Sequence, residues 1–105
     1  MKLRFINDER GEDHFKRHGP LLGLATREEY MLAAEKLMLG PSRPGVLEFL
    51  RAQGDIARFD TTAEEFGVIG PDKVTLRTYY LPVPGVSHKQ TTNLDYFNAQ
   101  QLRKF

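Results

Sequence analysis

The chain has 105 residues, of which 40 % are hydrophobic and 28 % are charged, with a formal net charge of +1 and no cysteine. This length suits one domain with a modest core and excludes a second domain. The lack of cysteine excludes disulfides, thiolate nucleophiles and cysteine-bound zinc. Because the net charge is close to zero, contact with nucleic acid would need a local basic site. The sequence shows neither an apolar run long enough to cross a membrane nor the apolar region of a signal peptide.

The N-terminal third of the chain predicts an arm followed by helices. Residues 1–11 are polar and are expected to form the arm, with residues 3–6 as a short edge strand. Residues 12–18 predict a short helix, because acidic residues stand near its start and Gly19-Pro20 follows it. We place the two expected helices together within residues 12–40.

The second helix has the clearer signals. It opens with Thr26 as the cap and Glu29 three residues later, which is the capping-box arrangement. Gly40-Pro41 is expected to end it, since glycine adopts the left-handed cap conformation and proline cannot continue a helix. Between these signals one apolar stripe repeats at helical spacing, made of Tyr30, Ala33, Ala34, Leu37 and Met38.

Residues 46–82 predict an antiparallel sheet of two hairpins. The first joins 46–53 to 55–60 across Gly54-Asp55, and the second joins 65–70 to 74–82. Strict alternation along the last strand divides its side chains between two faces. One face takes Val74, Leu76, Thr78 and Tyr80, and the other takes Thr75, Arg77, Tyr79 and Leu81.

The C-terminal segment 83–105 is expected to be a loop up to about residue 92, with a strand or short helix around 94–102. Helices followed by antiparallel strands predict one α+β domain over residues 12–105, with two N-terminal helices on one face of a four- or five-stranded sheet. The other face is then expected to be open for a ligand and to carry Arg58 or its neighbours together with Arg77.

The stretch DHFKRHG (residues 13–19) places His14 and His18 on one helix face, with Lys16 and Arg17 between them. Three interpretations compete: a solvated helix, a metal site and an acid–base pair. A metal site needs a third ligand, and the glutamate of the H-E-x-x-H pattern is missing. An acid–base pair needs only one neutral and one protonated imidazole. We favour this last interpretation, which requires no metal and no other cofactor.

Cleavage of RNA uses such a pair, because one group takes the 2′-hydroxyl proton, a second protonates the leaving 5′-oxygen, and cations stabilise the charge at phosphorus. Lys16 and Arg17 would attract the phosphate, and Arg77 can contact it through two hydrogen bonds. In a flat strand Arg77 and Thr78 point to opposite faces, so one pocket holds both only where the strand bulges or twists.

The residues around Arg77 have two interpretations. Thr78, Tyr79 and Tyr80 can donate hydrogen bonds to a substrate or stack on a base. Alternatively, Thr78 and Tyr80 are ordinary core-face residues of a strand, and Tyr79 is an ordinary surface aromatic. His88 and Lys89, with no pattern around them, are interpreted as loop residues.

Five pieces of the sequence, in order, resemble one family of proteins. They are HFKRHG, EEYMLAAEKLM, GDIARFD, EEFGVI and LRTYYLP, which together span most of residues 13–82. This order is similar to the C-terminal toxin modules of bacterial contact-dependent growth inhibition and related polymorphic toxin systems. These modules resemble the barnase–EndoU–colicin–RelE (BECR) superfamily of metal-independent ribonucleases.

The resemblance implies a barnase-like fold and cleavage of RNA, often transfer RNA, by transesterification. It places the catalytic roles on His14, His18, Arg77, Thr78 and Tyr80. The chemistry of the residues themselves assigns substrate binding to Lys16, Arg17 and Tyr79. It also implies a cognate immunity protein as a partner, delivery from the cell surface or by secretion within a larger effector, and action in the cytoplasm of a target cell.

Two other functions compete with this one. The first is a non-catalytic protein-binding module of a phage or secretion system, which predicts an exposed apolar patch on the open sheet face. The second is a zinc-dependent hydrolase, which predicts a further metal ligand near the histidines. In all three cases the domain itself is not expected to insert into a membrane.

Overall fold

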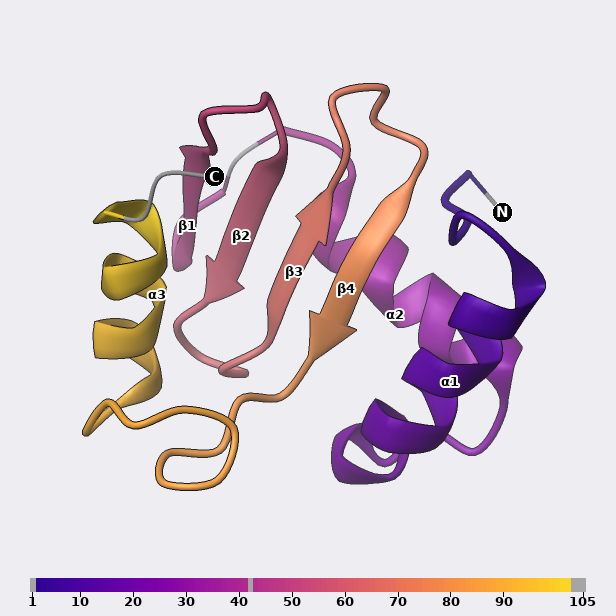
Figure 1. Ribbon diagram of the computed structural model, residues 1–105, viewed down its shortest axis with the longest axis horizontal. Coiled ribbons are helices and arrows are strands. Elements are labelled where there is room, and N and C mark those ends of the chain that lie inside the picture. The colour runs from indigo at the N-terminus through magenta and orange to yellow at the C-terminus, as the bar shows by residue number, and fades with distance from the viewer. Residues whose placement is uncertain (1, 42, 103–105) are drawn as a thin grey trace.

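The computed structural model describes residues 2–41 and 43–102, and it has helices at both ends of a four-stranded sheet (Figure 1). The expected α+β class is confirmed, but one helix follows the sheet instead of preceding it. No helix in these ranges is long and apolar enough to span a bilayer. In chain order the elements are α1 (Asp8–His18), the 3₁₀ turn η1 (Pro20–Leu22), α2 (Arg27–Met38), β1 (Val46–Leu50), β2 (Ile56–Asp60), β3 (Phe66–Ile69), β4 (Leu76–Tyr80) and α3 (Asn93–Leu102).

The first two helices begin at side-chain caps. Helix α1 starts four residues earlier than expected, because the side chain of Asn7 accepts a hydrogen bond from the Arg10 backbone N–H at 2.8 Å. Helix α2 has the expected capping box, with Thr26 and Glu29 each bonding to the other's backbone N–H. It ends at Met38, slightly before the expected stop, and Gly40 follows with a φ of 85°.

The N-terminal arm is part of the core. The Arg4 backbone N–H donates to the Val74 carbonyl at 2.9 Å, and the Leu76 N–H donates to the Arg4 carbonyl at 2.7 Å. This makes one parallel bridge between Arg4 and Thr75, so the expected edge strand is reduced to a single bridge. The neighbouring Leu3 and Phe5 are buried, which ties the arm to the domain.

The four strands run antiparallel in the order β1-β2-β3-β4, as two successive hairpins predict. One irregularity interrupts the last pairing. Val68 pairs with Thr78 but Ile69 pairs with Leu76, which leaves Arg77 as an extra residue in β4. The expected strict alternation along β4 is therefore wrong: Leu76 and Tyr79 belong to the same core on the α2 side of the sheet.

Each face of the sheet has its own apolar cluster. The cluster on the α2 side includes Leu3, Phe5, Tyr30, Met31, Ala34, Leu37, Met38, Val46, Ile69, Leu76 and Tyr79. The cluster on the other side comprises Phe49, Ala57, Phe59, Phe66, Val68 and Phe97. Because Phe97 comes from α3, that helix covers part of the face that was expected to be open (Figure 1).

Arg58 is a structural residue and does not lie on an open face. Its side chain points toward α2 and is 5 % exposed. The guanidinium pairs with Glu48 at 2.7 Å and donates to the carbonyls of Leu37 at 3.2 Å and Gly40 at 2.8 Å. These carbonyls lie at the C-terminal end of α2, where backbone oxygens lack helical partners. The expectation that Arg58 serves a ligand is therefore wrong.

Candidate active site

The two histidines of α1 lie together beside the sheet. Their spacing of four residues brings the ring centroids of His14 and His18 to 5.6 Å. His14 stacks on Phe5 of the arm at 4.8 Å, and His18 stacks on Tyr80 of β4 at 5.0 Å. The histidine face of α1 is thus half-buried against the arm and the last strand, so a fully solvated helix does not describe it.

Burial and charge both make these imidazoles harder to protonate. Desolvation is the main cause, and the positive charge of Arg17 adds to it, so the pKa of His14 lies below 6.5 and that of His18 falls to about 4. His14 also repels a proton on His18. Asp13 acts in the opposite direction, but it is ion-paired with Arg17 at 2.8 Å. At neutral pH His18 is therefore a proton acceptor.

The two ring nitrogens of His14 differ in accessibility. Its Nδ1 is buried and has no hydrogen-bond partner among the described residues. Nε2 is then the nitrogen that a ligand can reach. Because an unpaired Nδ1–H is costly to bury, the same feature disfavours a proton on both nitrogens.

Arg77 reaches the same region through the bulge in β4. It lines a small cleft of about 160 Å³ together with Arg10, His14 and Phe5, and no carboxylate lines this cleft. Arg10 has no ion-pair partner among the described residues, whereas Arg77 has a long contact of 3.5 Å with Asp55. Arg10 and Arg77 thus line the same cleft as His14, and of the two only Arg10 adds to the lowering of the His14 pKa. The sequence did not single out Arg10, because nothing marks it except its position one helical turn before His14.

Two neighbouring tyrosines of β4 have opposite environments. Tyr79 is fully buried, and its hydroxyl donates to Glu65 at 2.6 Å, so it cannot stack on a substrate base. The expectation that Tyr79 binds substrate is wrong because the bulge turns its ring toward α2. Tyr80 is partly exposed and its ring stacks on His18. Burial raises the pKa of both tyrosines and keeps both hydroxyls protonated.

The remaining expected residues are Thr78, Lys16 and Arg17, and none of them lines the cleft with Arg77. Thr78 is half-buried, makes no side-chain hydrogen bond among the described residues, and does not line the cleft with Arg77. Lys16 and Arg17 are exposed and pair with Glu12 at 3.8 Å and Asp13 at 2.8 Å. They contribute positive charge near the histidines without converging on Arg77.

A second group of polar aromatic residues approaches Tyr80 from the C-terminal segment. The hydroxyls of Tyr80 and Tyr96 are 2.5 Å apart, and His88 stacks on Tyr96 with the ring centroids at 4.3 Å. His88 Nε2 lies 2.8 Å from Oδ1 of the buried Asn93. His88 lies in the loop between β4 and α3, as expected, and from there it contacts Tyr96 and Asn93.

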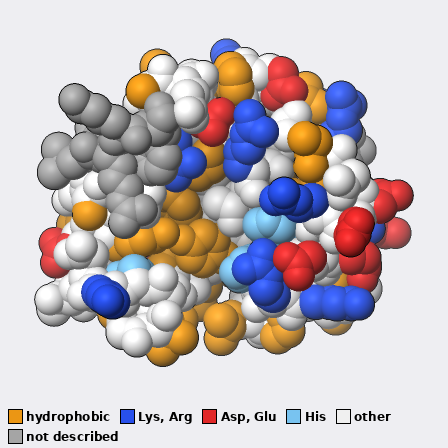
Figure 2. All heavy atoms as spheres, viewed as in Figure 1, with side chains coloured by type: hydrophobic (Ala, Val, Ile, Leu, Met, Phe, Trp, Pro, Cys, Tyr) orange, Lys and Arg blue, Asp and Glu red, His pale blue; other side chains and the backbone are white. Residues whose placement is uncertain are grey.

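These residues surround a hollow on the sheet face opposite α2. Figure 2 shows apolar side chains on its floor, histidine on both sides, and arginine or lysine side chains along its upper rim. The ring centroid of the buried Phe66 lies 5.7 Å from that of Tyr80 and 5.8 Å from that of Tyr96.

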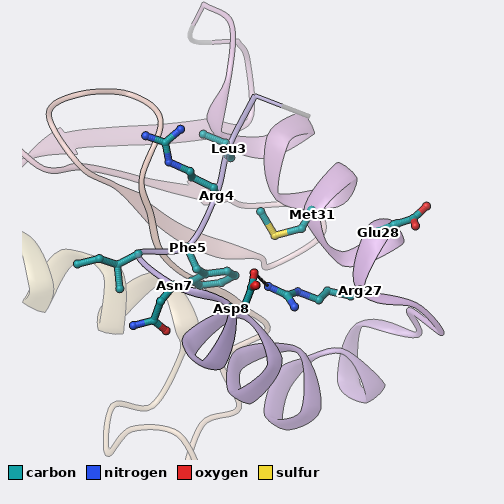
Figure 3. Close-up of a pocket in the computed structure, with 9 residues that line it drawn as sticks. Leu3, Arg4, Phe5, Asn7, Asp8, Arg27, Glu28 and Met31 are labelled. Carbon is teal, nitrogen blue, oxygen red and sulfur yellow. Dashed lines mark hydrogen bonds and ion pairs between the residues drawn. The ribbon is translucent and has the colours of Figure 1, made fainter.

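A larger pocket of about 660 Å³ lies elsewhere, between the N-terminal arm and the start of α2 (Figure 3). Leu3, Phe5 and Met31 supply apolar lining, and Asp8 pairs with Arg27 at 3.5 Å at one side. Two arginines, Arg4 and Arg27, line this pocket, but no histidine does. We therefore place the candidate active site at the histidines and not in this pocket.

Within residues 2–41 and 43–102, no three histidine or acidic side chains gather closely enough to hold a metal ion. The third ligand that a zinc-dependent hydrolase would need is thus not found near the histidines. No protein-family model matches the sequence, and a search of curated proteins gives no match.

Proposed function

We propose that this domain is a metal-independent endoribonuclease of the toxin type, acting on RNA and most readily on transfer RNA. The observation that carries the proposal is the placement of His14 and His18 between Tyr80 on one side and the Arg10–Arg77 cleft on the other. This arrangement combines proton acceptors, a hydroxyl donor and anion-binding groups within one surface.

The chemistry would run as a transesterification. His18, neutral at physiological pH because its pKa is about 4, accepts the 2′-hydroxyl proton. The 2′-oxygen then bonds to phosphorus while the bond from phosphorus to the 5′-oxygen breaks. His14, protonated on both nitrogens once the phosphodiester is bound, would give its Nε2 proton to that leaving oxygen and return to neutral imidazole. The products are a 2′,3′-cyclic phosphate and a free 5′-hydroxyl.

Binding of the substrate would also prepare the proton donor. The negative charge of a phosphodiester favours protonated imidazole, so it opposes the burial and the Arg17 charge that lower the pKa of His14. Arg10 and Arg77 would hold the non-bridging oxygens and stabilise the charge that builds up on them. Tyr80 would donate a hydrogen bond from the other side, next to His18.

The test is incubation of the purified domain with total transfer RNA and, separately, with duplex DNA. We expect cleavage of RNA alone, because the reaction requires a 2′-hydroxyl. The double substitution His14→Ala/His18→Ala should lower the rate by at least about 10³-fold, since each proton-transfer role contributes roughly 10²–10⁴. The matched control is Lys2→Ala/Lys36→Ala, which removes two exposed cations outside the candidate site and should keep most of the rate. Intact RNA with the wild-type protein, or equal cleavage by the histidine variant, would refute the proposal.

The apolar hollow also supports a second candidate function, a protein-binding module. The two functions differ in their effect on cells. A ribonuclease produced without an immunity protein should stop growth of the host, and the double histidine substitution should restore it. A binding module should permit growth in both forms.

A further inference from the structure

The hydroxyl of Tyr80 has one protein partner among the described residues, the hydroxyl of Tyr96 in α3. The two oxygens are 2.5 Å apart, and both rings contact Phe66 by their edges. Tyr80 is also the residue that His18 stacks on. A side chain from the C-terminal helix therefore fixes the orientation of a hydroxyl in the candidate active site.

The position of Tyr96 is itself fixed by His88. The two rings are nearly parallel, with an interplanar angle of 8° and centroids 4.3 Å apart. His88 covers one face of the Tyr96 ring, and the ring centroids of Phe66 and Tyr96 are 5.8 Å apart. Little freedom therefore remains for rotation of the phenol ring.

The hydrogen bonds around His88 assign its proton. The Asn93 amide Nδ2 donates to the Pro82 carbonyl at 2.8 Å and to Glu64 at 3.4 Å, so its Oδ1 must be an acceptor. His88 Nε2 therefore carries the hydrogen and donates to Asn93 at 2.8 Å. The other nitrogen, Nδ1, accepts from the Gln90 backbone N–H at 3.1 Å. Both nitrogens of this ring are occupied, so His88 cannot move a proton without losing one of these bonds.

From these contacts we propose that Tyr96 is a positioning residue for the ribonuclease site, and that His88 and Asn93 hold Tyr96 in place. Either hydroxyl could donate in this pair, and the proposal assigns the donor to Tyr96. The Tyr80 hydrogen is then free to point at a phosphate oxygen of the substrate. The inference rests on the proposed function for its effect on activity. It also assigns α3 and the loop before it a role in positioning Tyr80, although the resemblance to the toxin modules ends at residue 82.

The experiment compares Tyr96→Phe with Tyr30→Phe in steady-state cleavage of RNA. Both substitutions remove one tyrosine hydroxyl that is hydrogen-bonded in the interior, since Tyr30 donates to the Tyr79 carbonyl. We expect Tyr96→Phe to lower kcat about fivefold with little change in KM, the rate equivalent of one hydrogen bond. Tyr30→Phe should keep the wild-type kcat at temperatures where it is folded, because its hydroxyl does not touch the site.

A double substitution separates positioning from general damage. If Tyr96 acts through Tyr80, then Tyr80→Phe/Tyr96→Phe should be no slower than Tyr80→Phe alone. Unfolding in urea gives a readout without substrate: the two single substitutions should lower stability by amounts that do not add, because they break the same bond.

The possible outcomes distinguish a failure of the role of Tyr96 from a failure of the ribonuclease proposal. Cleavage by Tyr96→Phe at the wild-type rate, or additive losses in both measurements, would overturn this inference and leave the ribonuclease proposal intact. If the wild-type protein cleaves no RNA, the ribonuclease proposal and the role of Tyr96 in it both fail.

Discussion

His18 occupies a position that changes its acid–base behaviour. A free imidazole titrates near pH 6.5, but burial against Tyr80 and the charge of Arg17 lower the pKa of His18 to about 4. The residue types alone suggested an acid–base pair that works at neutral pH. The structure adds that burial and the positive charge of Arg17 disfavour a proton on either imidazole.

The first prediction concerns stability and pH. Between pH 6.5 and 4 the unfolded chain binds a proton at His18 and the folded chain does not, so the free energy of unfolding should fall as the pH falls through this range. Allowing for partial exposure, we expect a loss of about 1–2 kcal/mol. Below pH 4 this contribution should level off. Urea unfolding at pH 7, 5.5 and 4 measures it.

His18→Gln removes this titrating group, so the free energy of unfolding should depend less on pH. A smaller dependence should remain, because the pKa of His14 is also lowered. Lys16→Gln is the control, because it changes an exposed charge on the same helix and keeps both imidazoles. Equal pH slopes in the wild type and His18→Gln would show that His18 titrates normally.

Single residues also show where prediction from the sequence stops. Strict alternation predicts Tyr79 and Tyr80 on opposite faces, with Tyr80 on the core face if neither serves the site, yet Tyr79 is in the core and Tyr80 is in the candidate site. Their roles are decided by the extra residue Arg77, which shifts the phase of β4. The sequence could show that a bulge was needed there, but not which tyrosine it would bury.

Among the elements, α2 depends on a side chain from the sheet for its C-terminal end. Arg58 of β2 donates to the carbonyls of Leu37 and Gly40 and pairs with Glu48 of β1, so one residue joins the helix to two strands. Its burial makes these bonds strong, because water does not compete for them.

The second prediction follows from this contact. Arg58→Met keeps much of the side-chain volume but removes all three bonds, and it should lower the free energy of unfolding by roughly 2–3 kcal/mol. Lys36→Met, in the last turn of the same helix but exposed, should cost only a few tenths of a kcal/mol. Chemical denaturation monitored by circular dichroism compares the two. A similar, small loss for both would mean that Arg58 does not secure α2.

Helices and strands whose caps or turns lie in neighbouring residues could be predicted from the sequence. How these elements pack against one another was harder to predict. The capping box of α2 and both hairpins depend on neighbouring residues, and all three are present. Helix α1 starts before its expected first residue because the side chain of Asn7 caps it. The packing of α3 on the sheet depends on contacts of Phe97 with Phe49 and Phe59, which are distant in sequence.

For the whole molecule, the candidate site is built from both ends of the chain around the last strand. Helix α1 brings the histidines, the bulge of β4 brings Arg77, and the C-terminal segment brings Tyr96 and His88 to Tyr80. The small net charge of +1 is compatible with this arrangement, because Arg10 and Arg77 gather at one cleft while most other charges near α1 are paired.

The measurement that tests the central claim most directly is the chemical nature of the ends that the protein leaves on RNA. A labelled RNA oligonucleotide incubated with the domain in excess EDTA should be cut, and the 5′ fragment should end in a 2′,3′-cyclic phosphate. An RNA with a 2′-deoxy sugar at the cut position should stay intact there. A product ending in a 3′-hydroxyl, cleavage at the deoxy position, or complete loss of cutting with EDTA would contradict proton transfer by His14 and His18 as the basis of the reaction.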